Sequence, residues 1–484
     1  MSLCNNRFVE FFCGGATRDT LQGGNVSNAV VFMADEHNPF YSSVYGHPSL
    51  DTPNLQRLAQ SGSTYANAYT PCPLCMPSRS AFLTGKRVHE ISVFSNCTAH
   101  LDTNHLTLGK VFVDQGVHGV NIGTLHAFDR PENLGFSELL FPHAPAPPGD
   151  CNHGRTPLMI RHNAANRANS FGPRDDAFVR DRTSIEAASA WLTRRAPQMD
   201  RPWCLVINLS KPHFPLFAEP EYWRRVENLI DLPHSGIECE SAQHPYAQDL
   251  RAHFQMEQFT IDQVRGLRQG YFACVSFADE QLGRIMDTLA ETGLARTTNL
   301  FYTSDHGEML GKFGMWWKCH GYEDAVRIPM IAAGPDFPSA TRVSTPVDLL
   351  DLQATLFRVL GATRPYDWRG TPLTELPAHD PDRVIFSEYH GHGTRSGLFV
   401  IRKGDWKLIY YMAGPHQLFD LAHDPQERVN RYKAEPEKAK ALERELHRIC
   451  DPVAVNQRAH QLEREQLASL GLLNGTTARP DVDN

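Results

Sequence analysis

Short apolar runs that end abruptly in polar residues constrain the fold of this chain most strongly. Residues 28–34 form one continuous apolar run with β-branched members, which is typical of a strand buried on both faces of a parallel sheet. Similar runs predict further strands at 117–122, 203–209 and 299–303. Apolar residues at helical spacing predict helices at 52–59, 106–115, 184–192, 271–289 and 348–361. The chain therefore fits the α/β class.

Polar residues follow each of these predicted strands. Asp35 and Glu36 follow the first strand, and Asp305 and His306 follow the last one. Because ligands gather at the carboxyl ends of strands in open α/β sheets, acidic residues at this position are natural metal ligands. An aspartate such as Asp35 can also simply cap the next loop, and a single loop histidine is most often a surface residue. The other two strands end near Thr124, His126, Lys211 and His213.

The stretch at 71–85 places a cysteine, a proline and an arginine at the start of a predicted helix. Pro77 suits a first helical turn, and the stretch ends in a glycine. Cys75 then lies just ahead of a helix N-terminus, where the helix dipole stabilises negative charge. As an unmodified residue it would be a low-pKa thiolate favoured by the helix terminus and Arg79. Cys72 and Cys75 could also form a redox pair or half of a zinc site, but no second pair follows at zinc-finger spacing.

Cys-Met-Pro-Ser-Arg at 75–79, with Leu-Thr-Gly at 83–85, resembles the signature of the formylglycine-dependent sulfatases. The resemblance implies that a formylglycine-generating enzyme oxidises Cys75 to formylglycine, whose hydrate is a gem-diol that attacks the sulfur or phosphorus of an ester. It also implies the fold of the alkaline phosphatase superfamily. That fold is an α/β/α sandwich with a large, mixed, mostly parallel sheet, plus a smaller C-terminal α+β domain with an antiparallel sheet.

Ser-Asp-His-Gly-Glu at 304–308, followed by Lys318, resembles the second metal motif and the catalytic lysine of the same family. The resemblance implies one divalent metal, with Asp35, Glu36, Asp305 and His306 as its ligands. Oxygen ligands suit calcium, whereas an imidazole is better tolerated by manganese, so either ion fits. A noncatalytic metal-binding protein is an alternative, and it would require that Cys75 stay a thiol.

The resemblance also implies roles for the other polar residues at this edge of the sheet. Arg79 would hold the developing alkoxide, and Lys211 and Lys318 would hold the nonbridging oxygens of the ester. His213 would protonate the departing alcohol, and His126 would help to deprotonate the second gem-diol hydroxyl. The expected substrates are aryl or alkyl sulfate monoesters.

Gly-Thr-Leu-His at 123–126 departs from most sulfatases, which have G-K-x-H at this point. Thr124 stands where the lysine is expected, while His126 keeps its place. Related phosphonate monoester hydrolases and phosphodiesterases also lack this lysine, and Asn96 resembles an active-site asparagine of several branches. A phosphonate monoester hydrolase or phosphodiesterase is therefore an alternative. In another interpretation Thr124 only fills the site, and Lys211 and Lys318 supply the positive charge.

The organisation along the chain predicts a leader and two domains. Residues 1–26 are expected to be a poorly ordered leader, 27–376 the catalytic domain, and 382–484 a C-terminal α+β subdomain with a helical tail. Predicted in this subdomain are strands at 384–386, 398–401 and 406–410 and helices at 435–450 and 462–473. Segments 128–174 and 217–266 have no clear pattern, and the first is interpreted as long loops over the site.

Composition limits the partners of the chain. Among its 484 residues, 41% are hydrophobic and 21% charged, and no apolar run approaches the length that crosses a bilayer. The formal net charge of -8 argues against a nucleic-acid partner. The eleven cysteines lack the spacing of a secreted disulfide domain, which favours reduced cysteines and a cytoplasmic location. The amphipathic tail helices could dock on a partner subunit, so a homodimer or homotetramer is expected.

Overall fold

The computed structural model describes residues 26–97, 101–128, 130–141, 155 and 158–471. At its centre lies an eight-stranded sheet in the order β12-β2-β11-β9-β1-β7-β4-β5. The strands are β1 Asn28–Ala34, β2 Gly62–Tyr65, β4 His118–Ile122, β5 Glu138–Leu140, β7 Trp203–Leu209, β9 Thr298–Thr303, β11 Met330–Ala333 and β12 Thr341–Val343. Only β11 runs antiparallel to its neighbours within this described sheet. The four strands predicted from apolar runs are confirmed, and they stand side by side as β9-β1-β7-β4.

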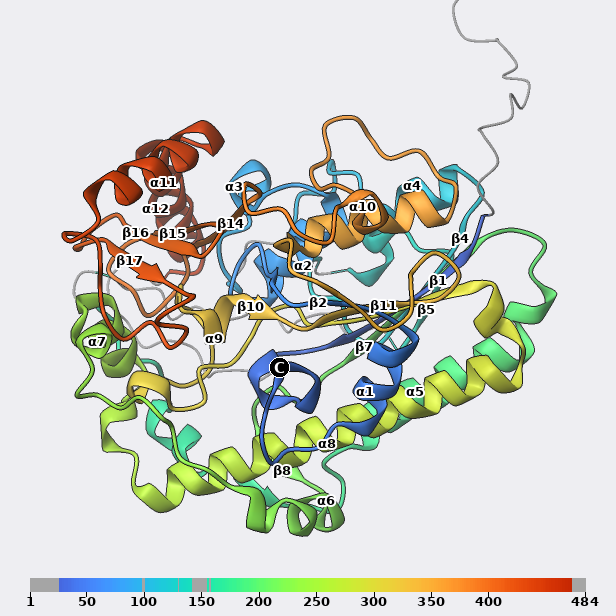
Figure 1. The fold of residues 1–484 in the computed structure, drawn as a ribbon, viewed down its shortest axis with the longest axis horizontal. Helices are drawn as coiled ribbons and strands as arrows, with labels where there is room; N and C mark the ends of the chain where they lie inside the picture. The colour runs from blue at the N-terminus through green and yellow to red at the C-terminus, as the bar shows by residue number, and fades with distance from the viewer. Residues whose placement is uncertain (1–25, 98–100, 129, 142–154, 156–157, 472–484) are drawn as a thin grey trace, which may run out of the picture.

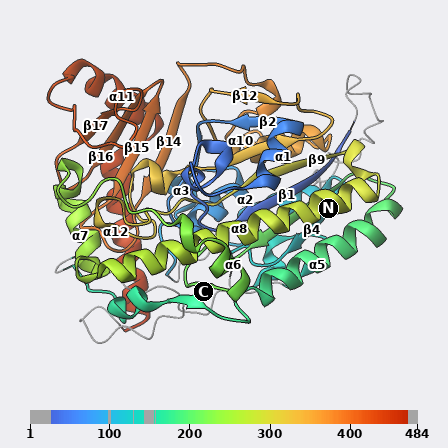
Figure 2. The same cartoon turned by 60° about the horizontal axis from the view of Figure 1, so that its bottom comes forward.

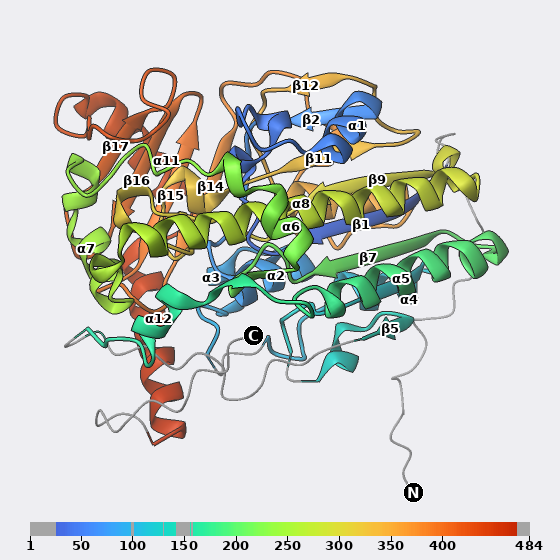
Figure 3. The same cartoon turned by 90° about the horizontal axis from the view of Figure 1, so that it is seen from below.

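Helices cover both faces of this sheet (Figures 1 and 3). On one face lie α1 Pro53–Ser61, α5 Val179–Arg194, α6 Pro220–Arg225 and α8 Ile261–Glu291, and on the other lie α2 Cys75–Thr84, α3 Val88–Ile91, α4 Leu108–Asp114 and α10 Leu349–Val359. A hydrophobic core lies on each face of the sheet, and alternate side chains of β1 pack into the two cores. Val30 and Phe32 pack into one, and Val31 and Met33 pack into the other. The expected α/β/α sandwich is confirmed.

A second, antiparallel sheet lies at one end of the molecule (Figure 2). It consists of β14 Val384–Tyr389, β15 Leu398–Lys403, β16 Trp406–Tyr411 and β17 Gln417–Asp420, with α11 Pro436–Ile449 packed on β15 and β16 and α12 Pro452–Ser469 following. The smaller elements are β3 Ala68–Tyr69, β6 Phe171–Pro173, β8 Leu216–Ala218, α7 Pro245–His253, α9 Glu323–Val326, β10 Arg327–Ile328 and β13 Val347–Asp348. The antiparallel C-terminal sheet is confirmed, while the domain boundaries at 376 and 382 stay a prediction.

The structure adds elements where the sequence shows no pattern. β5 lies inside the predicted loops at 128–174, and this short, half-buried edge strand gives no readable alternation. α6, α7 and the start of α8 lie within 217–266. α8 begins at Ile261, well before the predicted 271, because Thr260 and Gln263 form a capping box there.

The predictions for the two ends of the chain can be compared with the structure only in part. The predicted leader lies almost wholly outside the described residues, as do the last residues of the predicted tail helix. Among the eight cysteines that the structure describes, no two are joined by a disulfide. Among the described helices, none combines the length and the apolar character that a membrane crossing demands.

Candidate active site

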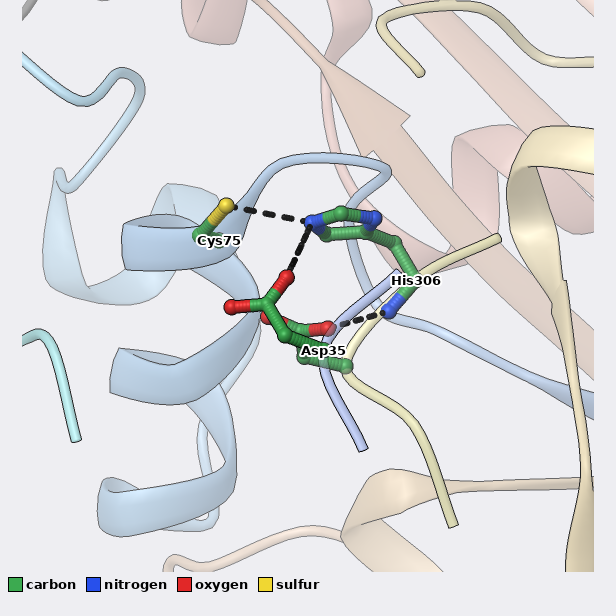
Figure 4. A group of neighbouring side chains, drawn as sticks. Asp35, Cys75 and His306 are labelled. Carbon is green, nitrogen blue, oxygen red and sulfur yellow. Dashed lines mark hydrogen bonds and ion pairs between the residues drawn. The ribbon is translucent and has the colours of Figure 1, made fainter. Parts of the chain in front are cut away.

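Three elements bring the predicted metal motif and the predicted nucleophile together. Asp35 follows β1, and Asp305 and His306 follow the neighbouring parallel strand β9, so their carboxyl ends meet. Cys75 is the first residue of α2, and its Sγ lies 3.1 Å from Nε2 of His306 (Figure 4). One atom from each of Asp35, Cys75, Asp305 and His306 lies within 4.8 Å of the others.

The donor set of this cluster fits a divalent cation. Oδ1 of Asp35 is buried without a hydrogen-bond partner, which is rare for a carboxylate oxygen in a protein interior. Burial and the nearby Asp305 raise the pKa of Asp35 to about 7. Burial also lowers the pKa of His306 to about 4, which keeps its imidazole neutral and able to ligate a metal. A cation here would offset the repulsion between the carboxylates.

Glu36 lies at the side of this cluster, between two other predicted site residues. Its Oε1 is 3.2 Å from Nζ of Lys318, and its Oε2 is 3.4 Å from Nε2 of His213. Glu36 and His213 form a second group of potential metal ligands with Asp35. The structure therefore joins Asp35, Asp305 and His306 directly to Cys75, and it places Glu36 toward the lysine and the histidine.

Arg79 is completely engaged with the ends of the central strands. Its Nε donates to Asp305 at 2.8 Å, and its Nη2 donates to Asp35 at 2.9 Å. Its Nη1 donates to the main-chain oxygen of Thr124 at 3.0 Å and to Asn208 at 3.1 Å. Sequence reasoning missed Asn208, an amide within an otherwise apolar strand. In this structure Arg79 fixes the two carboxylates in place and offsets their charge.

The thiol of Cys75 differs from the low-pKa thiolate that an unmodified residue would be expected to form. Burial, with Asp35 and Asp305, raises its pKa well above the ordinary value, although Lys318 opposes this. These surroundings do not favour the low-pKa thiolate. Oδ1 of Asn96 accepts from the N–H of Met76 at 3.0 Å, which places the predicted asparagine directly beside the start of α2.

Lys318 and His213 form a tight pair whose protons can be assigned. Nδ1 of His213 contacts the carbonyl oxygen of Phe214, which only accepts, so Nδ1 carries the ring proton. Nε2 then accepts from the ammonium of Lys318 at 2.6 Å. Burial and Lys318 lower the pKa of His213 well below its usual value. In this arrangement the shared proton lies on Lys318, and the role of His213 in protonating the departing alcohol stays a prediction.

Lys211 is engaged by its own loop. Its Nζ donates to the carbonyl oxygens of Pro215 at 2.7 Å and His213 at 3.3 Å, and its N–H donates to Asp181 at 2.9 Å. These bonds secure the loop that carries His213. The contact of Lys211 with the ester oxygens stays a prediction.

Thr124 and His126 line one pocket together with Asp35, Arg79 and His213. Burial, Arg79 and Arg180 lower the pKa of His126 to about 3, so its imidazole is neutral at neutral pH. Arg180 of α5 also lines the pocket, and its Nη2 donates to Oγ1 of Thr124. Sequence reasoning missed Arg180, and no local signal could have revealed it, since α5 meets the loop at 124 only in the folded chain.

An α/β/α sandwich in which carboxylates, a histidine and a helix-borne cysteine meet at the strand ends defines a hydrolase of the alkaline phosphatase superfamily. Residues 27–362 match the sulfatase family, and residues 311–453 match the family described as N-sulphoglucosamine sulphohydrolase, C-terminal. The chain belongs to the sulfatase family and is a hydrolase that acts on sulfate esters. The family implies a formylglycine and a divalent metal, in agreement with the donor set around Cys75.

Two relatives illustrate the similarity along the sequence. A choline-sulfatase of Rhizobium meliloti (strain 1021) is 28% identical over 421 residues, which cover 83% of this chain and 82% of the relative. Arylsulfatase K of Xenopus laevis is 26% identical over 481 residues, which cover 91% of this chain and 86% of the relative. Both matches span most of each chain, so the similarity extends well beyond the signature around Cys75.

Solved structures share the fold at lower identity. A protein in complex with its substrate D-glucosamine-2-N,6-O-disulfate superposes with a TM-score of 0.70 at 20% identity, covering 93% of this chain and 100% of that one. A phosphonate monoester hydrolase from Silicibacter pomeroyi gives a TM-score of 0.69 at 21% identity, covering 87% and 94%. At these identities the superpositions establish the fold alone.

Proposed function

We propose that this chain hydrolyses small aryl or alkyl sulfate monoesters with a formylglycine made from Cys75 and one divalent metal, calcium or manganese. The observation that carries the proposal is the convergence of Asp35, Cys75, Asp305 and His306 within 4.8 Å. When present, the formylglycine would supply a hydroxyl nucleophile, and the metal would polarise the ester oxygen. The names of the relatives, choline-sulfatase and arylsulfatase K, support a sulfate monoester of either an alkyl or an aryl alcohol.

The remaining residues provide charge and protons. Lys318 and His213 would act as one unit, with the proton for the departing oxygen held on Nζ of Lys318 and the ammonium oriented by Nε2 of His213. Glu36 would position the ammonium of Lys318 through its Oε1, and its Oε2 accepts from the N–H of Phe214 at 3.4 Å. Arg79 would hold Asp35 and Asp305 in register. His126 is neutral and can accept a proton at the pocket wall.

A phosphonate monoester hydrolase is the second candidate, and Thr124 is the observation that favours it. A lysine at this position is expected in most sulfatases, whereas related phosphonate monoester hydrolases lack it. The similar fold of a phosphonate monoester hydrolase fits this candidate. It does not outweigh the family match over residues 27–362.

A substrate panel tests the proposal. Aryl sulfate, alkyl sulfate, phosphonate monoester and phosphodiester substrates with matched leaving groups would be compared by kcat/KM. We expect the sulfate monoesters to give the highest value. A higher value for the phosphonate monoester would establish the second candidate.

Three further parts of the proposal concern partners and location. Maturation would require a formylglycine-generating enzyme that acts on the 75–79 signature. A homodimer or homotetramer stays a prediction from the sequence of the tail helices, since the apolar side of α11 packs on β15 and β16 of the same chain. A cytoplasmic location stays a prediction from the cysteine pattern.

A further inference from the structure

Arg180 is a basic residue at the active-site pocket that the expected machinery does not use. It lies in the first turn of α5, which begins on the side of the sheet where β1 and β7 end (Figure 3). Its side chain is exposed, and it lines the same pocket as Asp35, Arg79, His126 and His213. A ligand that enters this pocket therefore meets the guanidinium of Arg180.

The other cations near Cys75 are already bound by protein groups. Arg79 pairs with two carboxylates, Asp35 at 2.9 Å and Asp305 at 2.8 Å. Lys318 lies 3.2 Å from Glu36, and the ammonium of Lys211 donates to two carbonyl oxygens. Each of these charges is therefore offset or engaged before any substrate arrives.

Arg180 differs from these cations in its partner. Its guanidinium donates to the neutral hydroxyl of Thr124, and no carboxylate of the described residues lies within ion-pair distance of it. The carboxylate of the adjacent Asp181 accepts hydrogen bonds from the main-chain N–H groups of Ser210 and Lys211. The positive charge of Arg180 is thus left for a ligand. The two guanidinium groups share Thr124, because Arg79 donates to its main-chain oxygen at 3.0 Å.

We propose that Arg180 binds a nonbridging oxygen of the sulfate group and supplies the charge expected from a lysine at position 124. The inference rests on the proposed function and adds to it a binding residue from a different element of the fold. A guanidinium presents several N–H donors in one plane, which suits tetrahedral oxyanions. The short side chain of Thr124 leaves space for the arginine and orients it through its hydroxyl.

Competitive inhibition by inorganic sulfate tests this proposal on the mature, metal-loaded enzyme. A hydrogen bond to a charged group contributes to the binding free energy of sulfate, and its loss weakens binding. Arg180→Ala should therefore raise the inhibition constant of sulfate by about 10-fold to 100-fold. Arg180→Gln should show the same loss, since it keeps a polar side chain but removes the charge. Arg194→Ala is the matched control, because it removes an exposed arginine from the last turn of the same helix, about 21 Å along its axis. The control should leave inhibition unchanged.

The outcomes separate the inference from the proposed function. An inhibition constant within about twofold of wild type in both Arg180 variants would overturn the role of Arg180 while sulfate ester hydrolysis stands. An equal loss in Arg194→Ala would overturn it as well, because the effect would then come from net charge alone. A wild-type enzyme that neither hydrolyses a sulfate ester nor is inhibited by sulfate would contradict the proposed function itself.

Discussion

Nζ of Lys318 lies 2.6 Å from Nε2 of His213, and the main chain at Phe214 fixes the proton of that imidazole on the opposite nitrogen. The histidine is therefore the acceptor in this pair and the lysine is the donor. General-acid help at this site depends on both residues, because loss of His213 leaves the ammonium without its orienting partner and loss of Lys318 removes the proton.

Leaving-group dependence tests this pair. A nitrophenolate leaves readily as an anion, whereas an alkyl alcohol requires a proton, and general-acid catalysis is typically worth about 10²–10⁴-fold. His213→Ala and Lys318→Ala should both slow alkyl and unactivated phenyl esters far more than nitrophenyl esters. The slope of log kcat/KM against leaving-group pKa should become steeper in each variant. A uniform loss across all leaving groups would mean that the pair only positions the substrate.

Metal dependence follows from the carboxylates around Cys75. Chelation should abolish activity, and calcium or manganese should restore it. Asp305→Asn should lower the bound metal, measured by elemental analysis after dialysis, and weaken metal affinity by about 10-fold or more. The matched control is Asp287→Asn. Asp287 is exposed and, among the described residues, pairs only with Arg57, so this variant should keep the wild-type metal content. Full activity in metal-free protein would exclude the site.

A buried ion-pair network joins the C-terminal sheet to the catalytic part of the chain. Nζ of Lys407 lies 2.9 Å from Glu323 and 2.7 Å from Glu427, and all three side chains are buried. Lys407, with two arginines, overcomes the effect of burial and lowers the pKa of Glu323 to about 2. Lys407→Met would remove the closest cation of both buried carboxylates, leaving Glu323 with arginines at 3.7 Å and 3.9 Å and Glu427 with Lys312 at 3.4 Å, so the free energy of unfolding should fall by about 3 kcal/mol.

Lys403→Met is the matched control for this network. Lys403 is part-exposed at the end of β15 and pairs with Glu445 at 3.4 Å, so its loss should cost less than about 1 kcal/mol. Denaturant unfolding of the two variants gives the comparison directly. Equal stabilities would show that the network contributes little to holding the C-terminal sheet against α9.

The pair between His89 and Glu388 predicts a pH effect on stability. Burial alone would lower the pKa of His89, but Glu388, 2.8 Å from its Nδ1, reverses this and raises the pKa above 6.5. A raised folded-state pKa contributes stability that is complete below pH 6.5 and is lost as the pH rises through the folded value.

A comparison of wild type with His89→Gln isolates this contribution. The difference in free energy of unfolding between the two proteins should be on the order of 1 kcal/mol larger at pH 6 than at pH 9. Chemical denaturation at several pH values measures it. A difference that is constant, or that grows toward alkaline pH, would contradict the assignment.

Sequence reasoning located much of the site because parallel strands end at one edge. Asp35, Asp305 and His306 follow apolar runs, so their convergence can be inferred from buried strands alone. Cys75 could be placed at a helix start from Pro77 and the glycine that follows. Each of these features can be read from a short stretch of sequence, and the parallel sheet then brings the stretches together.

The remaining features depend on tertiary contacts. Arg180 meets Thr124 across 56 positions of the chain, and no pattern in α5 distinguishes it from other surface arginines. The proton on Lys318 follows from a main-chain carbonyl beside His213, which residue types do not specify. Lys211 has the positive charge expected of a residue that binds the ester oxygens, but its ammonium donates to carbonyl oxygens of its own loop. Short edge strands such as β5 are missed for a different reason, because three residues are too few to show an alternation of apolar and polar side chains.

The two cysteines near the start of α2 should differ sharply when replaced. Cys75→Ala should abolish turnover and leave the fold intact, because only Cys75 contacts His306, at 3.1 Å. Cys72→Ala should have little effect on turnover, since its side chain is buried in the core and takes no part in the proposed mechanism. Circular dichroism and thermal unfolding report on the fold. Equal loss of activity in both variants would favour the redox-pair interpretation.

Mass spectrometry of the peptide that contains residue 75 tests the central claim most directly. Conversion of the cysteine to formylglycine exchanges sulfur for oxygen with loss of hydrogen, so the modified peptide is lighter and no longer alkylates. The account predicts that the lighter peptide is present in active enzyme and that its fraction rises in proportion to specific activity across preparations. A fully active preparation in which the peptide carries only unmodified Cys75 would contradict it.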